Sequence, residues 1–320
     1  MALAHFRFRI SAPSFRPTTQ CNFESVPMSL SLAQLRAVDA VARHGQISRA
    51  AQSLGLSQPS ISNQIQTFEA AWQIRFFDRD GYTITVRPDA EALLGRIRLA
   101  LDLFNEIETG LTAQSAMEAS TLSLGFSAHR LIMPALAKFV AHHPDIRIST
   151  LGAPSFDLLK AVKRGEIHLA SISSPEAPAG LHAVEVARRK LVVYGKRDHP
   201  LLANAHIDLA DLDGVSMVLW NENSGSRRQF DTICAAQKIF PKVAMAVNTL
   251  DVSYAAVAAG IGLGVAVEHE VQEDEYVKIA SLQADGAEVG QYLVCLKGAE
   301  LRPQIASFIE IAQETAAAFL

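Results

Sequence analysis

A loop with the sequence NENSGSRRQF, at residues 221–230, has residue types that suit the binding of an anion. Ser224, Gly225 and Ser226 come just before an expected helix, whose free N–H groups and dipole favour negative charge. Arg227, or the arginine after it, could add a bidentate charge-assisted contact. Serine and glycine before a helix are also ordinary caps, so this loop alone does not establish a binding site.

Polar residues in three other loops could share a ligand with this one. Each of these loops follows an expected strand, and ligands of open α/β proteins bind outside the carboxyl ends of the strands. We therefore expect all four loops to rim one cleft. The further candidates are Ser127, His129, Ser173, Ser174, Asn248 and Thr249.

Other chemistries find little support in the residue spacing. The glycines of GIGLG at 260–264 lie at an expected helix end and inside a strand, whereas a dinucleotide fingerprint needs a strand before it and a helix after it. The histidines, including His142 and His143, do not fall at metal-ligand spacing with cysteines or acids. No GxSxG elbow or catalytic cysteine signature is present. We expect no cofactor, no metal and no enzymatic activity.

A helix-turn-helix is predicted at 47–68, ISRAAQSLGLSQPSISNQIQTF. Ser48 is expected to cap the first helix, and Gly55 to end it in the left-handed conformation. Ser57 would then cap the second helix. Pro59 fits its first turn, where backbone N–H groups have no intrahelical partner.

The second of these helices should have a buried stripe and a polar face. Ile61, Ile65 and Phe68 recur at i, i+4 and i+7, which leaves polar side chains pointing outward. Such a face could enter a DNA major groove, although an ordinary helical hairpin would also solvate it. The candidate DNA-binding residues are Arg36, Arg49, Ser57, Gln58, Pro59, Ser60, Ser62, Asn63 and Arg79.

A two-stranded wing is predicted after the second helix. Asp80-Gly81 precedes an alternation of apolar and polar residues from 82 to 86. Arg75, Arg79 and Arg87 could contact DNA phosphates from this wing, or they could simply lie on a solvated edge.

The stretch LAQLRAVDAVARHGQISRAAQSLGLSQPSIS resembles the opening of LysR-type transcriptional regulators almost position by position. The resemblance implies a winged helix-turn-helix that binds double-stranded operator DNA, and it implies contact with RNA polymerase. A solute-binding protein would need an export signal in place of this unit. The predicted location is the cytoplasm.

Several positions depart from the family pattern. Asn63, Gln66 and Thr67 stand where arginine or lysine is usual, which should flatten the salt dependence of DNA binding. Gln73 replaces a usual glycine after the second helix. His168 replaces a usual aspartate, which questions a contact expected between the lobes.

A long helix is expected from Pro88. Its apolar residues follow spacings of three and four through Leu101, Phe104 and Leu111, with no obvious partner in the same chain. The resemblance makes this the linker helix, through which the protein forms a homo-oligomer, either a dimer or a tetramer. A hinge is expected at 114–120.

From Thr121 onward, strands alternate with helices in two successive sets, so the predicted fold is α/β with a mostly parallel sheet. The chain enters the second set and later leaves it, which implies two lobes joined by crossing strands around a cleft. The family resemblance implies an effector-binding domain similar to periplasmic binding proteins.

The segments SGSRRQFD, AAVAAGIGLGVAVEHEV and YLVCL resemble regulators associated with aminoethylphosphonate catabolism. This resemblance implies a small anionic effector, such as the phosphonate 2-aminoethylphosphonate. An aromatic or aliphatic carboxylate is the alternative effector.

Length and composition fit this organisation. The 320 residues are 49% hydrophobic, and the net charge of −4 means that DNA binding must come from a local surface. Three widely separated cysteines indicate a reducing compartment, and no long apolar run predicts a membrane span. The expected parts are an extension at 1–27, either disordered or mis-annotated from an upstream start codon; a winged helix-turn-helix at 28–87; a linker helix at 88–115; and an effector domain at 121–320.

Overall fold

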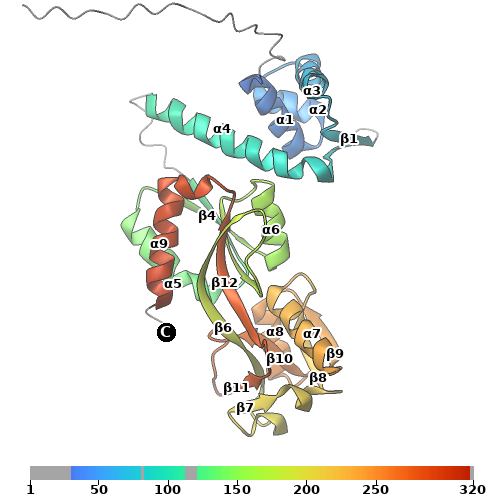
Figure 1. Cartoon of the computed structure of the whole chain (residues 1–320), viewed down its shortest axis with the longest axis vertical. Coiled ribbons are helices and arrows are strands. Elements are labelled where there is room, and N and C mark those ends of the chain that lie inside the picture. Colours follow the sequence, from blue (N-terminus) through green and yellow to red (C-terminus); the bar gives the residue numbers. More distant parts are fainter. Residues whose placement is uncertain (1–29, 81–82, 112–120, 318–320) are drawn as a thin grey trace, which may run out of the picture.

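The computed structural model describes residues 30–80, 83–111 and 121–317. The expected extension at 1–27, the tip of the wing and the expected hinge at 114–120 lie outside these residues. The described parts follow one another along the long axis of the molecule as a helical head, a long helix and two lobes (Figure 1).

The head contains three helices and a hairpin. Ser31 and Gln34 form a capping box at its first helix, and Gly45 and Gly55 end the first two helices with φ of 65° each. Gly55 therefore behaves as predicted, whereas Ser48 does not cap: the second helix already begins at Ile47, after extended Gln46. The elements are α1 (Leu32–His44), α2 (Ile47–Leu54), α3 (Gln58–Trp72), β1 (Phe77–Asp80) and β2 (Thr83–Val86).

The end of α3 resolves the question raised by Gln73. This residue takes the left-handed conformation, with φ of 52°, and its N–H still bonds back to the last turn of the helix. The helix thus ends where the family's glycine would end it, at a conformational cost of about 1–2 kcal/mol for a residue with a side chain. The strands β1 and β2 pair antiparallel, which confirms the expected wing.

The long helix α4 (Glu91–Leu111) follows a short 3-10 turn, η1 (Pro88–Ala90). Leu94, Ile97 and Leu101 are buried in the core of the head. The expectation that this stripe has no partner in its own chain is therefore wrong for these three residues, because α4 is the fourth helix of the head core. The side chains of Phe104 and Ile107 remain 44% and 59% exposed farther along.

The region after Thr121 builds one continuous sheet with helices on both faces. Its helices and longer strands are β3 (Thr121–Phe126), α5 (His129–His142), β4 (Arg147–Gly152), α6 (Ser155–Lys163), β5 (Leu169–Ser174), β6 (His182–Lys196), β8 (Ser216–Trp220), α7 (Gly225–Gln237), β9 (Lys242–Val247), α8 (Leu250–Ala258), β10 (Leu263–Val267), β11 (Val277–Gln283), β12 (Glu288–Cys295) and α9 (Pro303–Ala317). Short elements are η2 (Pro200–Leu202), β7 (His206–Asp208), η3 (Leu209–Leu212) and η4 (Ala299–Leu301).

The sheet order is β4-β3-β5-β12-β6-β10-β8-β9, and β11 and β7 lie off this path. Strands are parallel within the first lobe (β4, β3, β5) and within the second (β10, β8, β9). The long strands β6 and β12 run antiparallel through the middle and carry the chain from one lobe to the other (Figure 1). The predicted crossing strands are thus present, but they make the centre of the sheet antiparallel.

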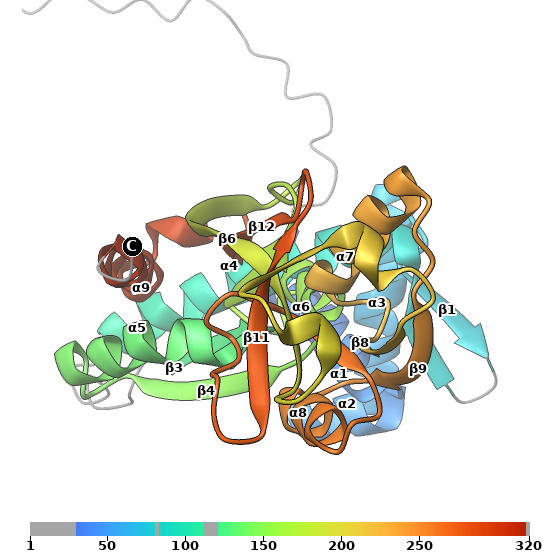
Figure 2. The same cartoon turned by 90° about the horizontal axis from the view of Figure 1, so that it is seen from below.

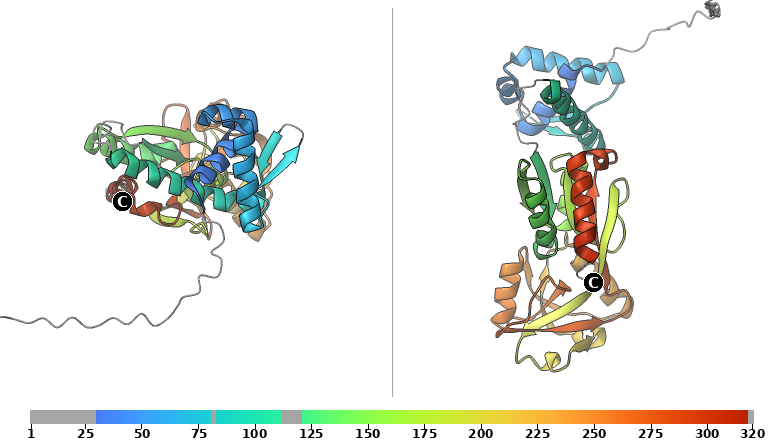
Figure 3. Two further views of the ribbon diagram at one scale, coloured as in Figure 1. Left: turned by 90° about the horizontal axis from the view of Figure 1, so that it is seen from above. Right: turned by 90° about the vertical axis from the view of Figure 1, so that its left-hand side faces the viewer.

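Separate apolar clusters cover the two faces of each lobe. In the first lobe, α5 and α9 lie side by side on one face, where the rings of Phe139 and Phe308 meet edge to face at 5.3 Å (Figure 2). The second lobe lies beyond the first, on the side away from the head (Figure 3). This arrangement fixes the positions of the strand ends between the two lobes.

Polar contacts tie α4 to the first lobe. Arg98 is buried, donates to Asp39 of α1 at 2.6 Å, and donates to the carbonyl of Arg164 at 2.7 Å. His168 Nε2 lies 3.4 Å from Asp102 of α4, and its Nδ1 accepts a hydrogen bond from the N–H of Ser123. His168 therefore contacts the linker helix α4. The sequence had instead suggested a contact between the lobes.

Candidate functional site

The exposed face of α3 offers short polar side chains. Ser57 caps the helix by accepting from the N–H of Ser60 at 3.3 Å, and Pro59 lies in the first turn as predicted. Gln58, Asn63 and other outward residues surround this start, while Ile61, Ile65 and Phe68 are buried at 0–3% exposure. Buried contacts on one side thus hold a polar face toward solvent, as a recognition helix requires. Ser62 is half-buried beside it.

The arginines of the head differ in their availability to DNA. Arg36 pairs with Glu108 at 3.2 Å, and Arg87 pairs with Asp78 and Asp89. Hydrogen bonding to Asp89 is the main cause that raises the pKa of Arg87. Arg49, Arg75 and Arg79 are exposed and have no ion-pair partner among the described residues. These three are therefore the better placed of the candidates to meet phosphates.

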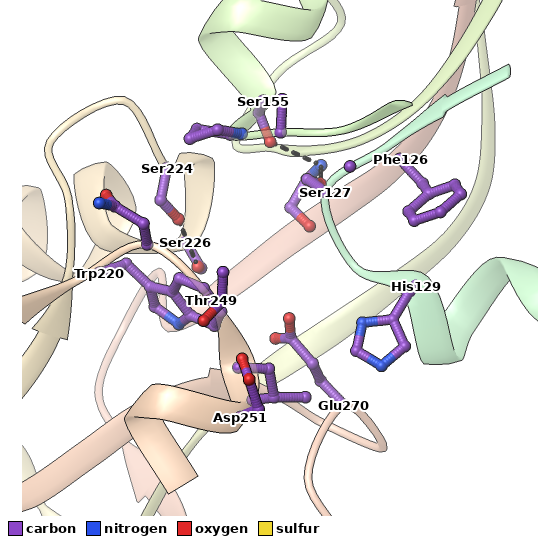
Figure 4. A pocket seen from close by; sticks show the side chains of 16 residues that line it. Phe126, Ser127, His129, Ser155, Trp220, Ser224, Ser226, Thr249, Asp251 and Glu270 are labelled. Carbon is purple, nitrogen blue, oxygen red and sulfur yellow. Dashed lines mark hydrogen bonds between the residues drawn. The ribbon is translucent and has the colours of Figure 1, made fainter. Parts of the chain in front are cut away.

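The largest cavity found among the described residues has a volume of about 560 Å³ and lies where the strands of both lobes end (Figure 4). Helix starts of α6, α7 and α8 open onto it. The lining residues are Phe126, Ser127, His129, Gly152, Ala153, Pro154, Ser155, Ser173, Trp220, Ser224, Ser226, Asn248, Thr249, Leu250, Asp251 and Glu270. A cavity of this size holds a small molecule.

Serine side chains form one end of this cavity. The N–H of Ser173 donates to the hydroxyls of Ser127 at 3.3 Å and Ser155 at 3.2 Å, within the first lobe. In the second lobe, the hydroxyls of Ser224 and Ser226 lie 3.0 Å apart. Rotatable hydroxyls and helix-start N–H groups from both lobes thus converge where an anion could bind.

The two lobes approach closely beside this serine end. A side-chain Cβ on Gly225 would lie 1.7 Å from the carbonyl oxygen of Ser173, so only glycine fits there. Gly225 is therefore a packing residue between lobes and does not line the cavity.

Carboxylates form the other end of the cavity. Glu270 is 4% exposed, and its Oε2 accepts from the N–H of Val267 at 3.1 Å. Burial raises the pKa of Glu270 to about 7. Hydrogen bonding from the Thr249 side chain lowers the pKa of Asp251. Figure 4 shows both carboxyl groups, with His129 near Glu270, on the side opposite Ser155.

An indole forms part of the wall between the two ends. Trp220 donates from Nε1 to the carbonyl of Val265 at 3.1 Å, which fixes the ring at the cavity. Its apolar surface restricts the space open to a ligand.

The structure does not bring Arg227 to the cavity. Its guanidinium pairs with Asp231 at 2.7 Å and donates to the carbonyl of Trp220 at 2.9 Å. The next residue, Arg228, lies over the ring of Phe156. Ser174 also lies off the cavity, where its hydroxyl donates to the carbonyl of Glu176. The arginine clamp expected from the sequence is therefore not formed at this cavity.

Two family descriptions match the chain. Residues 32–91 match "Bacterial regulatory helix-turn-helix protein, lysR family", and residues 115–317 match "LysR substrate binding domain", which covers more than half of the chain. The chain belongs to the LysR family of transcriptional regulators. No finding confirms the aminoethylphosphonate subfamily, which stays a prediction.

Known proteins agree with this assignment. The HTH-type transcriptional regulator CbbR of Rhodospirillum rubrum is 25% identical over 292 residues, covering 89% of this chain and 97% of CbbR. Full-length OxyR of Pseudomonas aeruginosa has the same fold, with a TM-score of 0.68 and 19% identity over 89% of this chain and 98% of that one. Full-length CbnR complexed with its target DNA has a TM-score of 0.55 and 21% identity, over 89% and 100% of the two chains.

In this LysR-type regulator, seven of the sequence candidates line the cavity together. They are Ser127, His129, Ser173, Ser224, Ser226, Asn248 and Thr249, and Asn248 also accepts a hydrogen bond from Asn221 at 2.6 Å. The prediction of one shared cleft rested on the carboxyl ends of strands. The strand ends do meet at one cleft, because the strands within each lobe are parallel.

Nine lining residues were not anticipated, and four of them have side chains with a hydrogen-bonding group: Ser155, Trp220, Asp251 and Glu270. Ser155 is the first residue of α6, after Pro154 at the N-cap, and unlike Ser224 it does not cap its helix, so only its place at a helix start could have revealed it. Asp251 lies in the first turn of α8. Trp220 and Glu270 carry no local signal, because only the fold brings them to the cleft.

Across residues 30–80, 83–111 and 121–317, no helix is long and apolar enough to cross a membrane. The same residues contain no cluster of three or more potential metal ligands. Cys234 and Cys295 are buried free thiols, and burial raises the pKa of Cys234 to about 11.

Proposed function

We propose that this LysR-type regulator binds operator DNA through α3 and the wing and responds to a small anionic effector held in the cleft. The observation that supports this effector site is that serine hydroxyls and helix starts from both lobes meet at one end of the cavity. A ligand that touches both lobes stabilises one relative position of the lobes over others, which is how its binding could reach the DNA-binding head. RNA polymerase and a second copy of the chain are the proposed protein partners, and the cytoplasm is the proposed location.

A phosphonate such as 2-aminoethylphosphonate is the proposed effector class. Its three oxygens suit several short donors, and Ser155, Ser224 and Ser226 offer hydroxyls from two helix starts. An aromatic or aliphatic carboxylate is the second candidate, because Phe126 and Trp220 give the cavity an apolar wall.

Calorimetric titration with 2-aminoethylphosphonate, phosphonoacetaldehyde, inorganic phosphate and benzoate tests the effector class. We expect the phosphonates to bind and Ser226→Ala to weaken them by about five- to tenfold, since a hydrogen bond to a charged group contributes about 1.5–3 kcal/mol and neighbouring donors compensate in part. Ser174→Ala, which alters a serine outside the cavity, is the matched control. Binding of benzoate alone would remove the phosphonate proposal, and undiminished affinity in Ser226→Ala would remove the serine end as the anion site.

A further inference from the structure

The cleft has two ends of opposite electrostatic character. Donors gather at the serine end, while Asp251 and Glu270 place two carboxyl groups at the other end (Figure 4). None of the described lining residues is a lysine or an arginine. A ligand that carried only negative charge would be attracted at the first end and repelled at the second.

Glu270 is the residue in the cleft with the least satisfied charge. Its side chain is 4% exposed, and the N–H of Val267 occupies one carboxyl oxygen. The other oxygen has no hydrogen-bond partner among the described residues, and the carboxyl group faces the cavity. A buried carboxylate is costly unless a cation or several donors reach it.

Neighbouring side chains do not supply that cation. Tyr194 interacts electrostatically with Glu270, but its hydroxyl forms a hydrogen bond of 2.6 Å with the hydroxyl of Ser253. Asp251 is itself acidic, and its stabilising contacts come from Thr249 and backbone N–H groups, with a smaller contribution from the charge of His129. His129 lines the same end of the cavity and makes no ion pair with Glu270. The missing positive charge is therefore expected to come from the ligand.

We infer that the effector is a zwitterion, whose acidic group binds at the serine end and whose ammonium group binds Glu270, with Asp251 adding negative potential nearby. This inference rests on the proposed effector cleft and narrows its ligand to small acids that carry an amine. An ammonium has three donors, so it could bond the open oxygen of Glu270 and still reach other acceptors. Loss of the amine would leave Glu270 buried without a partner, which makes Glu270 a specificity-determining residue.

Matched pairs of compounds that differ only in the amine test the inference. Calorimetric titrations use 2-aminoethylphosphonate against ethylphosphonate, and β-alanine against propionate, with the full-length protein. We expect the amine to tighten binding at least tenfold within the pair that binds, because a charge-assisted hydrogen bond is among the stronger polar contacts. Equal or tighter binding of the compounds without the amine would overturn the inference.

Two glutamate variants locate the effect. Glu270→Gln should remove the preference for the amine and leave the affinity for ethylphosphonate or propionate unchanged or improved. Glu268→Gln, two residues away and outside the cavity, should keep the wild-type preference. A preference that survives in Glu270→Gln would place the ammonium elsewhere and overturn the assignment.

The outcomes separate this inference from the proposed function. Binding of the compounds without the amine, weakened by Ser226→Ala, would retain the anion site and remove the ammonium site. Failure of all four compounds to bind would count against the proposed anion site as well. The comparison of matched compounds on the wild-type protein needs no variant, so the stability of Glu270→Gln does not limit it.

Discussion

In the unliganded protein, Glu270 lowers the free energy of unfolding by an amount that depends on pH. Burial raises its pKa from the ordinary 4.5 to about 7, so the folded state holds the proton that the unfolded state releases between these values. Below pH 4.5 the carboxyl group is protonated in both states and leaves the free energy of unfolding unchanged. As the pH rises from 4.5 to 7 the raised pKa lowers the free energy of unfolding, and the loss is complete above pH 7. The full loss above pH 7 is about 3 kcal/mol at most, at about 1.4 kcal/mol per pKa unit.

We predict that Glu270→Gln stabilises the protein at pH 8 and changes its stability little at pH 4.5. Urea denaturation of the wild type and the variant at both pH values measures the two differences. His129, Asp251 and Tyr194 also lie near this site, but they are present in both proteins and cancel in the comparison. A stabilisation of the same size at both pH values would contradict a charge-based cost.

Asn63 offers a test of DNA reading at the scale of one side chain. It is exposed on α3, opposite the buried Ile61 and Ile65. We predict that Asn63→Ala weakens cognate operator binding by about 1–3 kcal/mol and leaves binding to random DNA nearly unchanged, because base-edge contacts carry specificity. Ser60→Ala should act in the same direction.

Arg79 gives the contrasting result for a phosphate contact. Arg79→Ala should weaken cognate and random DNA alike and lower the salt dependence by about one counterion. Fluorescence titrations at several salt concentrations distinguish the two behaviours. Equal losses on both DNAs in Asn63→Ala would show that α3 touches only the backbone.

The helix α4 has two functions along its length. Its first half completes the core of the head through Leu94, Ile97 and Leu101, so a charge at Leu101 would damage the head itself. Its second half exposes Phe104 and Ile107, and exposed apolar side chains on one helix favour pairing with another copy. We propose that this second half is the surface through which two heads pair.

We predict that Phe104→Glu combined with Ile107→Glu yields monomers with weaker operator affinity. Paired heads read half-sites about one helical turn apart or a multiple of it, so a monomer loses half of its contacts. Sedimentation velocity measures the change in mass. Leu301→Glu is the control, because that side chain is 82% exposed but lies on the effector domain. Wild-type sedimentation of the double variant would rule out pairing through this surface.

At the scale of the whole molecule, α6 connects the cleft to the linker helix. It begins with Ser155 at the cavity and ends against α4, where a Cβ on Gly95 would lie 2.1 Å from the carbonyl oxygen of Lys163. Arg164 pairs with Glu91 at the same place, and Arg98 continues the contacts to Asp39 in the head. A change of lobe position thus has a short physical route to the DNA-binding unit.

We predict that Gly95→Ala separates α4 from the first lobe and uncouples the head from the effector domain. Alanine favours an isolated helix by about 1 kcal/mol over glycine, so a loss would come from the clash with α6 and not from helix propensity. Differential scanning calorimetry should then resolve two unfolding transitions, and Arg96→Ala, an exposed change on the same helix, should not. A single transition at an unchanged temperature would show that the close approach is unimportant.

The helix-turn-helix, the wing, the long helix and the alternation of strands and helices in two sets could all be predicted from the order of the residues. These features follow from local causes, namely caps, turn residues and periodic apolar positions, which act over a few residues. The shared cleft was also predictable, since Ser127, Ser224 and Thr249 each follow a strand whose carboxyl end had to face the same region.

Which side chains enter the cleft, and with what charge, depends on packing between segments that are far apart in the chain. Arg227 could turn inward or outward from the start of α7, and a carboxylate one turn away, Asp231, holds it outside. Glu270 lies 44 residues along the chain from Ser226 and 115 from Ser155, so its burial and open oxygen exist only after β10 joins the sheet. Long-range packing sets such orientations because the dielectric environment and the available partners of a charge come from the whole fold.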